Sequence, residues 1–323
     1  MKKMLKILGY TLATLLLVLL TVAAVIHFKG VPTYDYAPPE HIVQLKVELD
    51  SARIERGAKI ASILCAECHT GSGGKMTGRP VVDLPAMFGN IVTLNITHDK
   101  VKGIGNWTDG ELYYFLRTGI RKDGSWAPPF MPKYPLMADE DVQSIIAWLR
   151  SDDPRLEADS HEYAANQYNL LIKALSRTVF TAPPLPGAPI ALPDTTDKIA
   201  LGKYLSDAAF SCFVCHSESM TTFDLLVPER SKGFYGGGNP MQTPDGKIVN
   251  SANLTMDKET GLGNWTSAQF VDAVRFCKKP TGGSLSIPMM PHTALTDAEV
   301  EAIWAYLQTV PVIKNPVVRF KGN

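Results

Sequence analysis

The sequence has no surplus of charge of either sign. Its 323 residues include 32 Lys+Arg and 32 Asp+Glu, so the formal net charge at pH 7 is zero. A nucleic-acid-binding protein normally carries a basic surplus, so the charge balance excludes this class and we expect no nucleic-acid partner. Hydrophobic residues make up 45% of the chain and charged residues 20%. Such a composition is typical of a folded globular protein and too apolar for a disordered one.

Acidic residues are absent from residues 1–29, although Lys2, Lys3 and Lys6 lie there. The stretch Ile7–Ile26 that follows these lysines contains no charge, and its 20 residues are enough for a helix to cross a bilayer. The positive-inside rule places the N-terminus in the cytoplasm, so we expect the rest of the chain on the periplasmic side of the inner membrane. A cleaved signal peptide is the alternative, with Val22-Ala23-Ala24 as a cleavage site. The apolar core of a signal peptide usually has about 7–15 residues, so the length favours a retained anchor.

Strand signals are weak throughout, and the remaining chain contains an internal repeat. Asn95-Ile96-Thr97 and the Gly103–Thr108 stretch recur 158 residues later, and Met131-Pro132 recurs after 159 residues as Met290-Pro291. Helices are expected at these segments: 51–64, 109–117, 139–150, about 164–175, 197–209 and 297–307. Thr108 and Thr266 are expected to cap the helices that follow them. The pattern predicts a mainly α fold, with an N-terminal transmembrane helix followed by two copies of one domain.

The repeat divides the chain into five parts. Residues 1–29 are the anchor or signal peptide, 30–50 a tether, 51–151 the first domain, 152–195 a linker and 196–323 the second domain. The linker is expected to contain one helix and a stiff stretch rich in proline, from Pro183 to Pro193.

Cysteine is scarce, and four of the five cysteines lie in two copies of one motif. The copies are Cys65-Ala66-Glu67-Cys68-His69 and Cys212-Phe213-Val214-Cys215-His216. Cys-x-x-Cys-His is the attachment sequence of haem c, because one helical turn brings both thiols and the imidazole to one side. Composition alone predicts on the order of 0.002 such pentapeptides in the chain. The sequence therefore predicts two covalently bound haem c groups, with His69 and His216 as iron ligands.

Three other uses of the motif fit less well. A zinc site needs further Cys or His ligands at short spacing, and Cys277 is the only cysteine outside the two motifs. A thioredoxin-like redox pair belongs beside a βαβ pattern, which is not visible. A structural disulfide does not require His after the second cysteine in both copies.

A sixth iron ligand is expected from the repeated Met-Pro pairs. Met131 and Met290 each precede the last helix of their copy, and a thioether ligand would raise the reduction potential and suit electron transfer. Core filling is the alternative role of such methionines. Met289 could substitute for Met290, and His292 would give bis-His ligation, although a surface imidazole is expected there.

Other repeated residues are candidates for the haem surroundings. Trp107 and Trp265 follow a Gly-x-Gly-Asn turn, so we expect their rings at the haem edge with the indole N–H reaching a propionate. Arg117 and Arg275 would compensate the charge of a propionate. Cys277 aligns with Gly119 and is expected to be a buried free cysteine.

Together these motifs resemble the cytochrome c subunits of membrane-bound alcohol, gluconate and aldehyde dehydrogenases. The resemblance covers about residues 52–150 and 199–311, and includes Glu55-Arg56-Gly57 before the first cysteine motif. It implies that Cys65, Cys68, His69 and Met131 hold one haem and that Cys212, Cys215, His216 and Met290 hold the other. Those subunits typically have three haem domains, whereas this chain shows two. The resemblance therefore implies a membrane-anchored dihaem cytochrome c, in which a transmembrane helix precedes two tandem class I cytochrome c domains.

We expect a protein that transfers electrons and is not itself an enzyme. It would act as a carrier or as the electron-transfer subunit of a larger respiratory complex, with a membrane dehydrogenase, a quinol-oxidising complex or a terminal oxidase as redox partner. Residues 30–323 contain four more acidic than basic residues, so a partner with a basic patch is expected. A dihaem cytochrome c peroxidase is the alternative, but a peroxidase needs an iron with an open site and a nearby acid or base. The paired Met-Pro elements argue against it.

Overall fold

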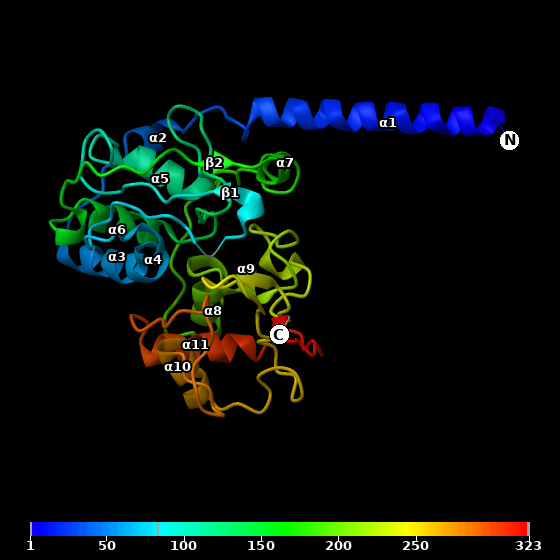
Figure 1. Cartoon of the computed structure of the whole chain (residues 1–323). Coiled ribbons are helices and arrows are strands. Elements are labelled where there is room, and N and C mark those ends of the chain that lie inside the picture. Colours follow the sequence, from blue (N-terminus) through cyan, green and yellow to red (C-terminus); the bar gives the residue numbers. More distant parts are fainter. Residues whose placement is uncertain (1, 83, 322–323) are drawn as a thin grey trace.

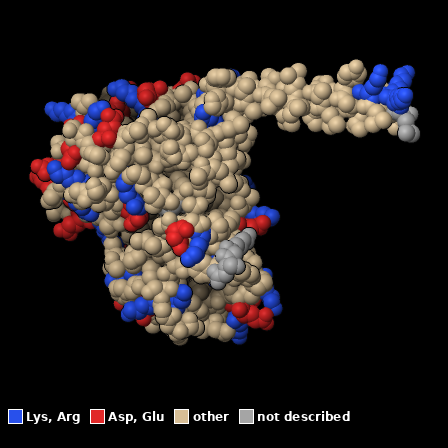
Figure 2. All heavy atoms as spheres, viewed as in Figure 1, with Lys and Arg blue, Asp and Glu red and all other residues tan. Residues whose placement is uncertain are grey.

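The computed structural model describes residues 2–82 and 84–321 and is mostly helical (Figure 1). Helix α1 (Lys2–Lys29) projects from the body of the molecule, and none of its residues is buried. Figure 2 shows basic side chains at its outer tip, and the long stretch between Lys6 and Lys29 contains no Lys, Arg, Asp or Glu. It is the one helix in the described ranges that is long and apolar enough to cross a membrane; a signal sequence has the same properties.

The first unit of the body surrounds a core formed mainly by α3 (Ser51–Leu64), α5 (Asp109–Thr118) and α6 (Asp139–Leu149). Helices α3 and α6 cross at Gly57, where an added Cβ would lie 1.8 Å from the carbonyl oxygen of Ser144. Only glycine permits this approach, so the sequence at this position determines how closely the two helices pack. Two shorter helices complete the unit, α2 (Glu40–Val43) and α4 (Ala66–His69).

The second unit repeats this helix packing. Its core lies between α8 (Lys198–Lys203), η3 (Tyr204–Ala209), α9 (Cys212–His216), α10 (Ser267–Phe276) and α11 (Asp297–Leu307). Helices α8 and α11 cross at Gly202, where an added Cβ would lie 1.9 Å from the carbonyl oxygen of Ala302. Segment η3 is a π-helical turn, which the sequence did not predict.

The expected helix caps are present in both units. Thr108 accepts a hydrogen bond from the backbone N–H of Glu111 at 3.1 Å, and Thr266 accepts one from Gln269 at 3.3 Å. The side chains of Glu111 and Gln269 bond back to the threonine N–H groups, which completes a capping box at each helix. Helices α5 and α10 therefore begin where the sequence predicted.

The linker differs from its prediction. Residues 164–166 are irregular, and helix α7 (Leu170–Thr178) begins about six residues later than expected. Asn166 explains part of the delay, because its side chain bonds to both backbone groups of Val92. Lys173 and Arg177 of α7 donate to backbone carbonyls at the end of α1.

Strands are short and lie at the edges of the units. Strand β1 (Gly89–Asn90) pairs antiparallel with β2 (Gln167–Tyr168), and β3 (Pro240–Gln242), β4 (Ile248–Asn250) and β5 (Phe320–Lys321) form an antiparallel sheet in that order. Three 3-10 turns complete the described elements: η1 (Ala86–Phe88), η2 (Pro154–Leu156) and η4 (Pro228–Arg230).

Side chains of α3, α6, α8, η3 and α11 join the two units. Lys59 of α3 forms an ion pair with Glu299 of α11. The hydroxyl of Tyr204 accepts from the N–H of Ala138 at 3.1 Å and donates to the carboxylate of Asp141. Because these contacts are at least partly shielded from water, they fix how the units sit against each other.

Candidate functional sites

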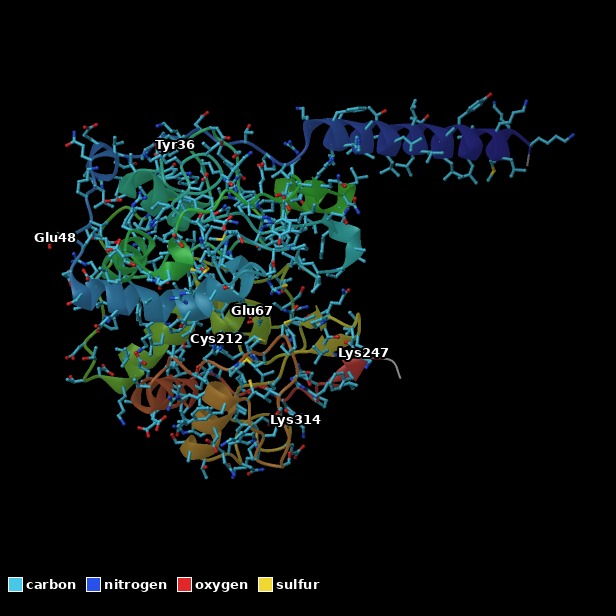
Figure 3. The ribbon with its side chains drawn as sticks, turned by 60° about the vertical axis from the view of Figure 1, so that its left-hand side comes forward. Tyr36, Glu48, Glu67, Cys212, Lys247 and Lys314 are labelled. Carbon is cyan, nitrogen blue, oxygen red and sulfur yellow. The ribbon has the colours of Figure 1, made fainter. Side chains whose placement is uncertain are left out.

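Each Cys-x-x-Cys-His motif forms a short helix at the boundary between the two units. Helix α4 lies at the lower edge of the first unit and α9 at the upper edge of the second, and Figure 3 labels Glu67 and Cys212 at this boundary. The apolar side chain of Ile63, just before the first motif, packs against the core of the second unit. The structure thus places the two motifs on facing sides of their units.

The motif residues adopt the geometry that the sequence predicted. The N–H groups of Cys68 and His69 both bond to the carbonyl of Cys65, so the two thiols and the imidazole share one helical turn. Cys65 and His69 are each 8% exposed. Burial raises the pKa of Cys65, and likewise of Cys212, to about 12. Among the described residues, no cluster of three or more His, Cys, Asp or Glu side chains could hold a metal ion.

The two motif histidines are oriented in the same way. Nδ1 of His69 lies 2.7 Å from the carbonyl oxygen of Leu94, and Nδ1 of His216 lies 2.9 Å from that of Ala252. A carbonyl only accepts, so Nδ1 carries the proton and Nε2 keeps the lone pair that binds a metal. Burial lowers the pKa of both imidazoles, that of His216 to about 4, so both are neutral at pH 7. This donor set fits a haem iron.

The repeated Asn-x-Thr stretches hold those two carbonyls in place, a role that the sequence analysis did not assign. Asn95 accepts from the N–H of Thr97 at 2.9 Å and from its hydroxyl at 2.7 Å, and donates to the carbonyl of Asp159 at 2.7 Å. Asn253 bonds in the same way to Thr255 and to the carbonyl of Ile313. Because Leu94 and Ala252 directly precede these asparagines, each clamp fixes the acceptor of a motif histidine. The Asn-x-Thr stretch recurs 158 residues later, and this repetition was the sequence feature that could have indicated the role.

The Met-Pro loops approach the motifs. Tyr134, three residues after Met131, is buried in the first core, and Met131 itself packs against this core, which includes Cys65. His292, two residues after Met290, is near enough to His216 to contribute to the lowered pKa of that imidazole. His292 itself is partly buried, and burial lowers its pKa, so the expectation of a surface imidazole was wrong. Ligation by Met131 and Met290 stays a prediction.

The two repeated tryptophans lie at the edges of the two cores. Trp107 packs against the first core and meets the ring of Phe115 edge-on, with centroids 5.5 Å apart. Trp265 packs against the second core. Their predicted contact with a haem edge stays a prediction.

The two arginines already have carboxylate partners. Arg117 is fully buried and donates to Asp139, to the hydroxyl of Tyr113 and to backbone carbonyls that include Tyr134. Arg275 pairs in the same way with Asp297. In both arginines Nε is buried and has no hydrogen-bond partner among the described residues. A propionate at Arg117 would have to bind at Nε, because its terminal nitrogens are fully engaged. Each terminal nitrogen of Arg275 makes one bond and has a second N–H, so a propionate there could also bind at these nitrogens.

Cys277 closes helix α10 in the left-handed conformation. Its φ of 56° matches the 76° of Gly119, which ends α5 at the equivalent point. The thiol is buried and donates to the carbonyl of Met289 at 3.5 Å. Its position agrees with a buried free cysteine.

The comparisons with known proteins identify the class of the first unit. Residues 52–149 match the family described as cytochrome C oxidase, cbb3-type, subunit III. This part of the chain, with Cys65, Cys68 and His69, is therefore a cytochrome c domain.

The wider chain is similar to cytochrome subunits of dehydrogenases. It is 30% identical to the fructose dehydrogenase cytochrome subunit of Gluconobacter japonicus, over 80% of this chain and 52% of the relative. It is 29% identical to the cytochrome c subunit of alcohol dehydrogenase (quinone) of Gluconacetobacter polyoxogenes, over 85% and 59%. A diheme cytochrome c-type protein of Cereibacter sphaeroides is 28% identical, over 77% and 83%. The chain thus spans between half and three fifths of the length of the two dehydrogenase subunits, both of which are named as cytochrome subunits.

Proposed function

We propose that this chain is a membrane-anchored dihaem cytochrome c that transfers electrons in a periplasmic respiratory chain. It acts as a carrier or as the electron-transfer subunit of a dehydrogenase complex. Residues 51–151 and 196–323 are its two tandem class I cytochrome c domains, and α1 is its anchor in the inner membrane.

One observation carries the proposal, namely the duplicated orientation of the motif histidines. In each unit a buried imidazole follows two thiols on one helical turn and donates Nδ1–H to a clamped backbone carbonyl. A haem bound at these residues supplies an iron that is reversibly reduced by one electron. The protein holds that iron through His69 or His216 and shields it from water.

The sixth ligand decides between a carrier and an enzyme. Met131 and Met290 occupy equivalent loops and would each supply a sixth ligand, which would leave neither iron with an open site for peroxide. The relatives that are named as cytochrome subunits of dehydrogenases agree with this assignment. A dihaem peroxidase is therefore not favoured.

The partners follow from the relatives and from the boundary between the units. Because α4 and α9 both lie toward the boundary between the units, an electron that entered at one haem could pass to the other inside one molecule. A membrane dehydrogenase is the proposed donor. A quinol-oxidising complex or a terminal oxidase completes the proposed respiratory chain.

The proposal is tested by counting covalent haems in the purified full-length protein. Pyridine haemochrome absorption and intact mass should give two haems per chain, and replacing both Cys212 and Cys215 by Ala should leave one. Cys277→Gly is the matched control, because the first unit has glycine at that position, and it should retain two. One haem in the unaltered protein would contradict the proposal.

Optical and EPR spectra of the oxidised protein test the rival activity. Two low-spin haems, a Met–iron charge-transfer band and no response to peroxide are expected. A high-spin haem that reacts with peroxide would instead identify a peroxidase.

A further inference from the structure

A buried acid lies beside the second motif. Asp207 is 4% exposed and belongs to the π-helical turn η3. Its carboxylate accepts hydrogen bonds from the hydroxyls of Tyr235 and Tyr306, each at 2.6 Å, and from Nζ of Lys203 at 3.3 Å. Among the described residues the other buried acid is Asp141, which is neutralised by Arg56 in a direct ion pair.

The first unit has apolar side chains where the second has this cluster. The carbonyl of Tyr235 accepts from the N–H of Leu254, and in the first unit Met76 makes the corresponding bond to Ile96. Tyr306 likewise corresponds to Trp148, near the end of the last helix. The buried residues of α3 are Gly57, Ile60 and Ala61, none of them acidic.

A local insertion accounts for the difference. Cys65 follows the crossing glycine Gly57 by eight positions, whereas Cys212 follows Gly202 by ten. The π-helical turn lies in this longer segment of the second unit. Such widened turns are frequent at functional sites, and here the turn directs Asp207 inward.

The carboxylate of Asp207 is close to the point of haem attachment. It precedes Cys212 by five residues, and η3 contacts α9. After burial, the charge of Asp207 is the next cause of the raised pKa of the Cys212 thiol. Tyr235, which bonds to the carboxylate, contacts Phe234, whose ring lies 6.0 Å from that of Phe213 within the motif.

The hydrogen bonds to Asp207 favour its charged form. Burial raises the pKa of this carboxyl above its ordinary value, while the bonds from Tyr235, Tyr306 and Lys203 oppose the rise. Lys203 does not neutralise the site, because its side chain is 47% exposed and also pairs with Glu229. The carboxylates of Asp207 and Glu229 and the single ammonium of Lys203 together carry a net negative charge at this end of the second unit.

We infer that Asp207 lowers the reduction potential of the haem held by His216 below that of the haem held by His69. The inference rests on the proposed function, since it requires two haems. A fixed negative charge in a poorly solvated site stabilises the oxidised iron, which carries one more positive charge than the reduced iron. Electrons move toward the higher potential, so they enter through the second unit and leave through the first.

A redox titration of the full-length protein tests this order with one isosteric variant. The unaltered protein should show two waves, and Asp207→Asn should shift the lower wave to higher potential while the upper wave stays in place. Glu301→Gln is the control, because Glu301 is an exposed acid on α11 that pairs with Lys198, and it should move neither wave. A shift of the upper wave, or no shift at all in Asp207→Asn, would overturn the inference.

A second measurement needs no variant. The titratable groups that face Asp207 or its partner Lys203 are those of Tyr235, Tyr306 and Glu229. Of the two carboxyls in this set, Asp207 has a raised pKa and Glu229 a lowered one. Protonation of Asp207 removes its charge, so the separation between the two waves should shrink as the pH falls through its pKa. A separation that does not change with pH contradicts the inference. Haem content, measured first, keeps the tests apart: one haem refutes the proposed function, whereas two haems with unmoved waves refute only this order.

Discussion

The carbonyl oxygen of Leu94 lies 2.7 Å from Nδ1 of His69, on the side of the ring opposite the atom that would bind iron. Asn95, the next residue, fixes this carbonyl by bonding both to Thr97 and to the carbonyl of Asp159. The direction of the imidazole therefore depends on the side chain of Asn95 as well as on the carbonyl of Leu94.

The Asn-x-Thr clamp should be required for both stability and ligation. Asn95→Ala leaves buried partners unpaired, so we expect the free energy of unfolding to fall by about 1–3 kcal/mol. Chemical denaturation measures this, and a weakened low-spin haem spectrum should accompany it. Asn90→Ala, at an exposed position of β1, should change the stability by less than about 0.5 kcal/mol. Equal effects of the two variants would argue against the clamp.

The glycine at the helix crossing should not tolerate a methyl group. In Gly57→Ala the new Cβ would overlap the carbonyl of Ser144, so helices α3 and α6 must separate, at a cost of about 1–3 kcal/mol. Gly73→Ala is the control, because no atom lies within 4 Å of its added Cβ. Denaturant unfolding should show a loss in the first variant and a change within about 1 kcal/mol in the second. A stable Gly57→Ala protein would mean that the crossing is looser than the structure shows.

Removing either loop methionine should affect one haem. Met131→Ala or Met290→Ala should lower the potential of a single haem and abolish part of the Met–iron band, while the protein still folds, because thioether ligation raises the potential. Met87→Ala should leave both potentials unchanged, since Met87 is 59% exposed on the surface. If Met290→Ala keeps both potentials and Met289→Ala lowers one of them, the ligand is Met289 and not Met290. Unchanged potentials in Met131→Ala would show that its assignment is wrong.

The contact between Lys59 and Glu299 should make the stability depend on pH. Burial alone would raise the pKa of Glu299, but bonds from Lys59 and from the N–H of Thr296 lower it below the ordinary value. A lowered folded-state pKa stabilises the protein above the unfolded pKa, and this contribution is lost as the pH falls through the folded value. The unfolding midpoint of Glu299→Gln should therefore be below that of the unaltered protein at pH 7.

The same comparison at acid pH completes this test. The two midpoints should converge once Glu299 is protonated in both states. Glu301→Gln, which removes a more exposed ion pair with Lys198, should have little effect at either pH. A difference that persists unchanged in acid would exclude Glu299 as its source.

Periodicity and capping residues were sufficient to locate most helices. The expected bounds 51–64 and 297–307 match α3 and α11, because apolar spacing and a capping residue agree there. The linker helix was placed too early, since Asn166 bonds to Val92 of a distant segment and holds the chain in an irregular conformation. Local sequence does not contain that contact.

The candidate sites also combine local features that the sequence could predict with tertiary contacts that it could not. The spacing of Cys65, Cys68 and His69 was sufficient to predict a shared helical turn, because the geometry is local. The buried neighbours of Asp207 were not predictable, since Tyr235 and Tyr306 reach it from other elements. For the same reason His292 was taken for a surface residue, although tertiary packing covers it.

The interface between the units contains two contacts at equivalent positions, one from each unit to the other. Lys59 lies two positions after Gly57 and Tyr204 two positions after Gly202. Their partners, Glu299 and Asp141, each lie three positions before the residue that faces the crossing glycine of the partner's own unit. The same patch on each unit therefore meets itself, as in an isologous two-fold dimer, although both halves belong to one chain. A closed interface of this kind leaves neither patch free, so any third domain or partner protein must bind elsewhere on the surface.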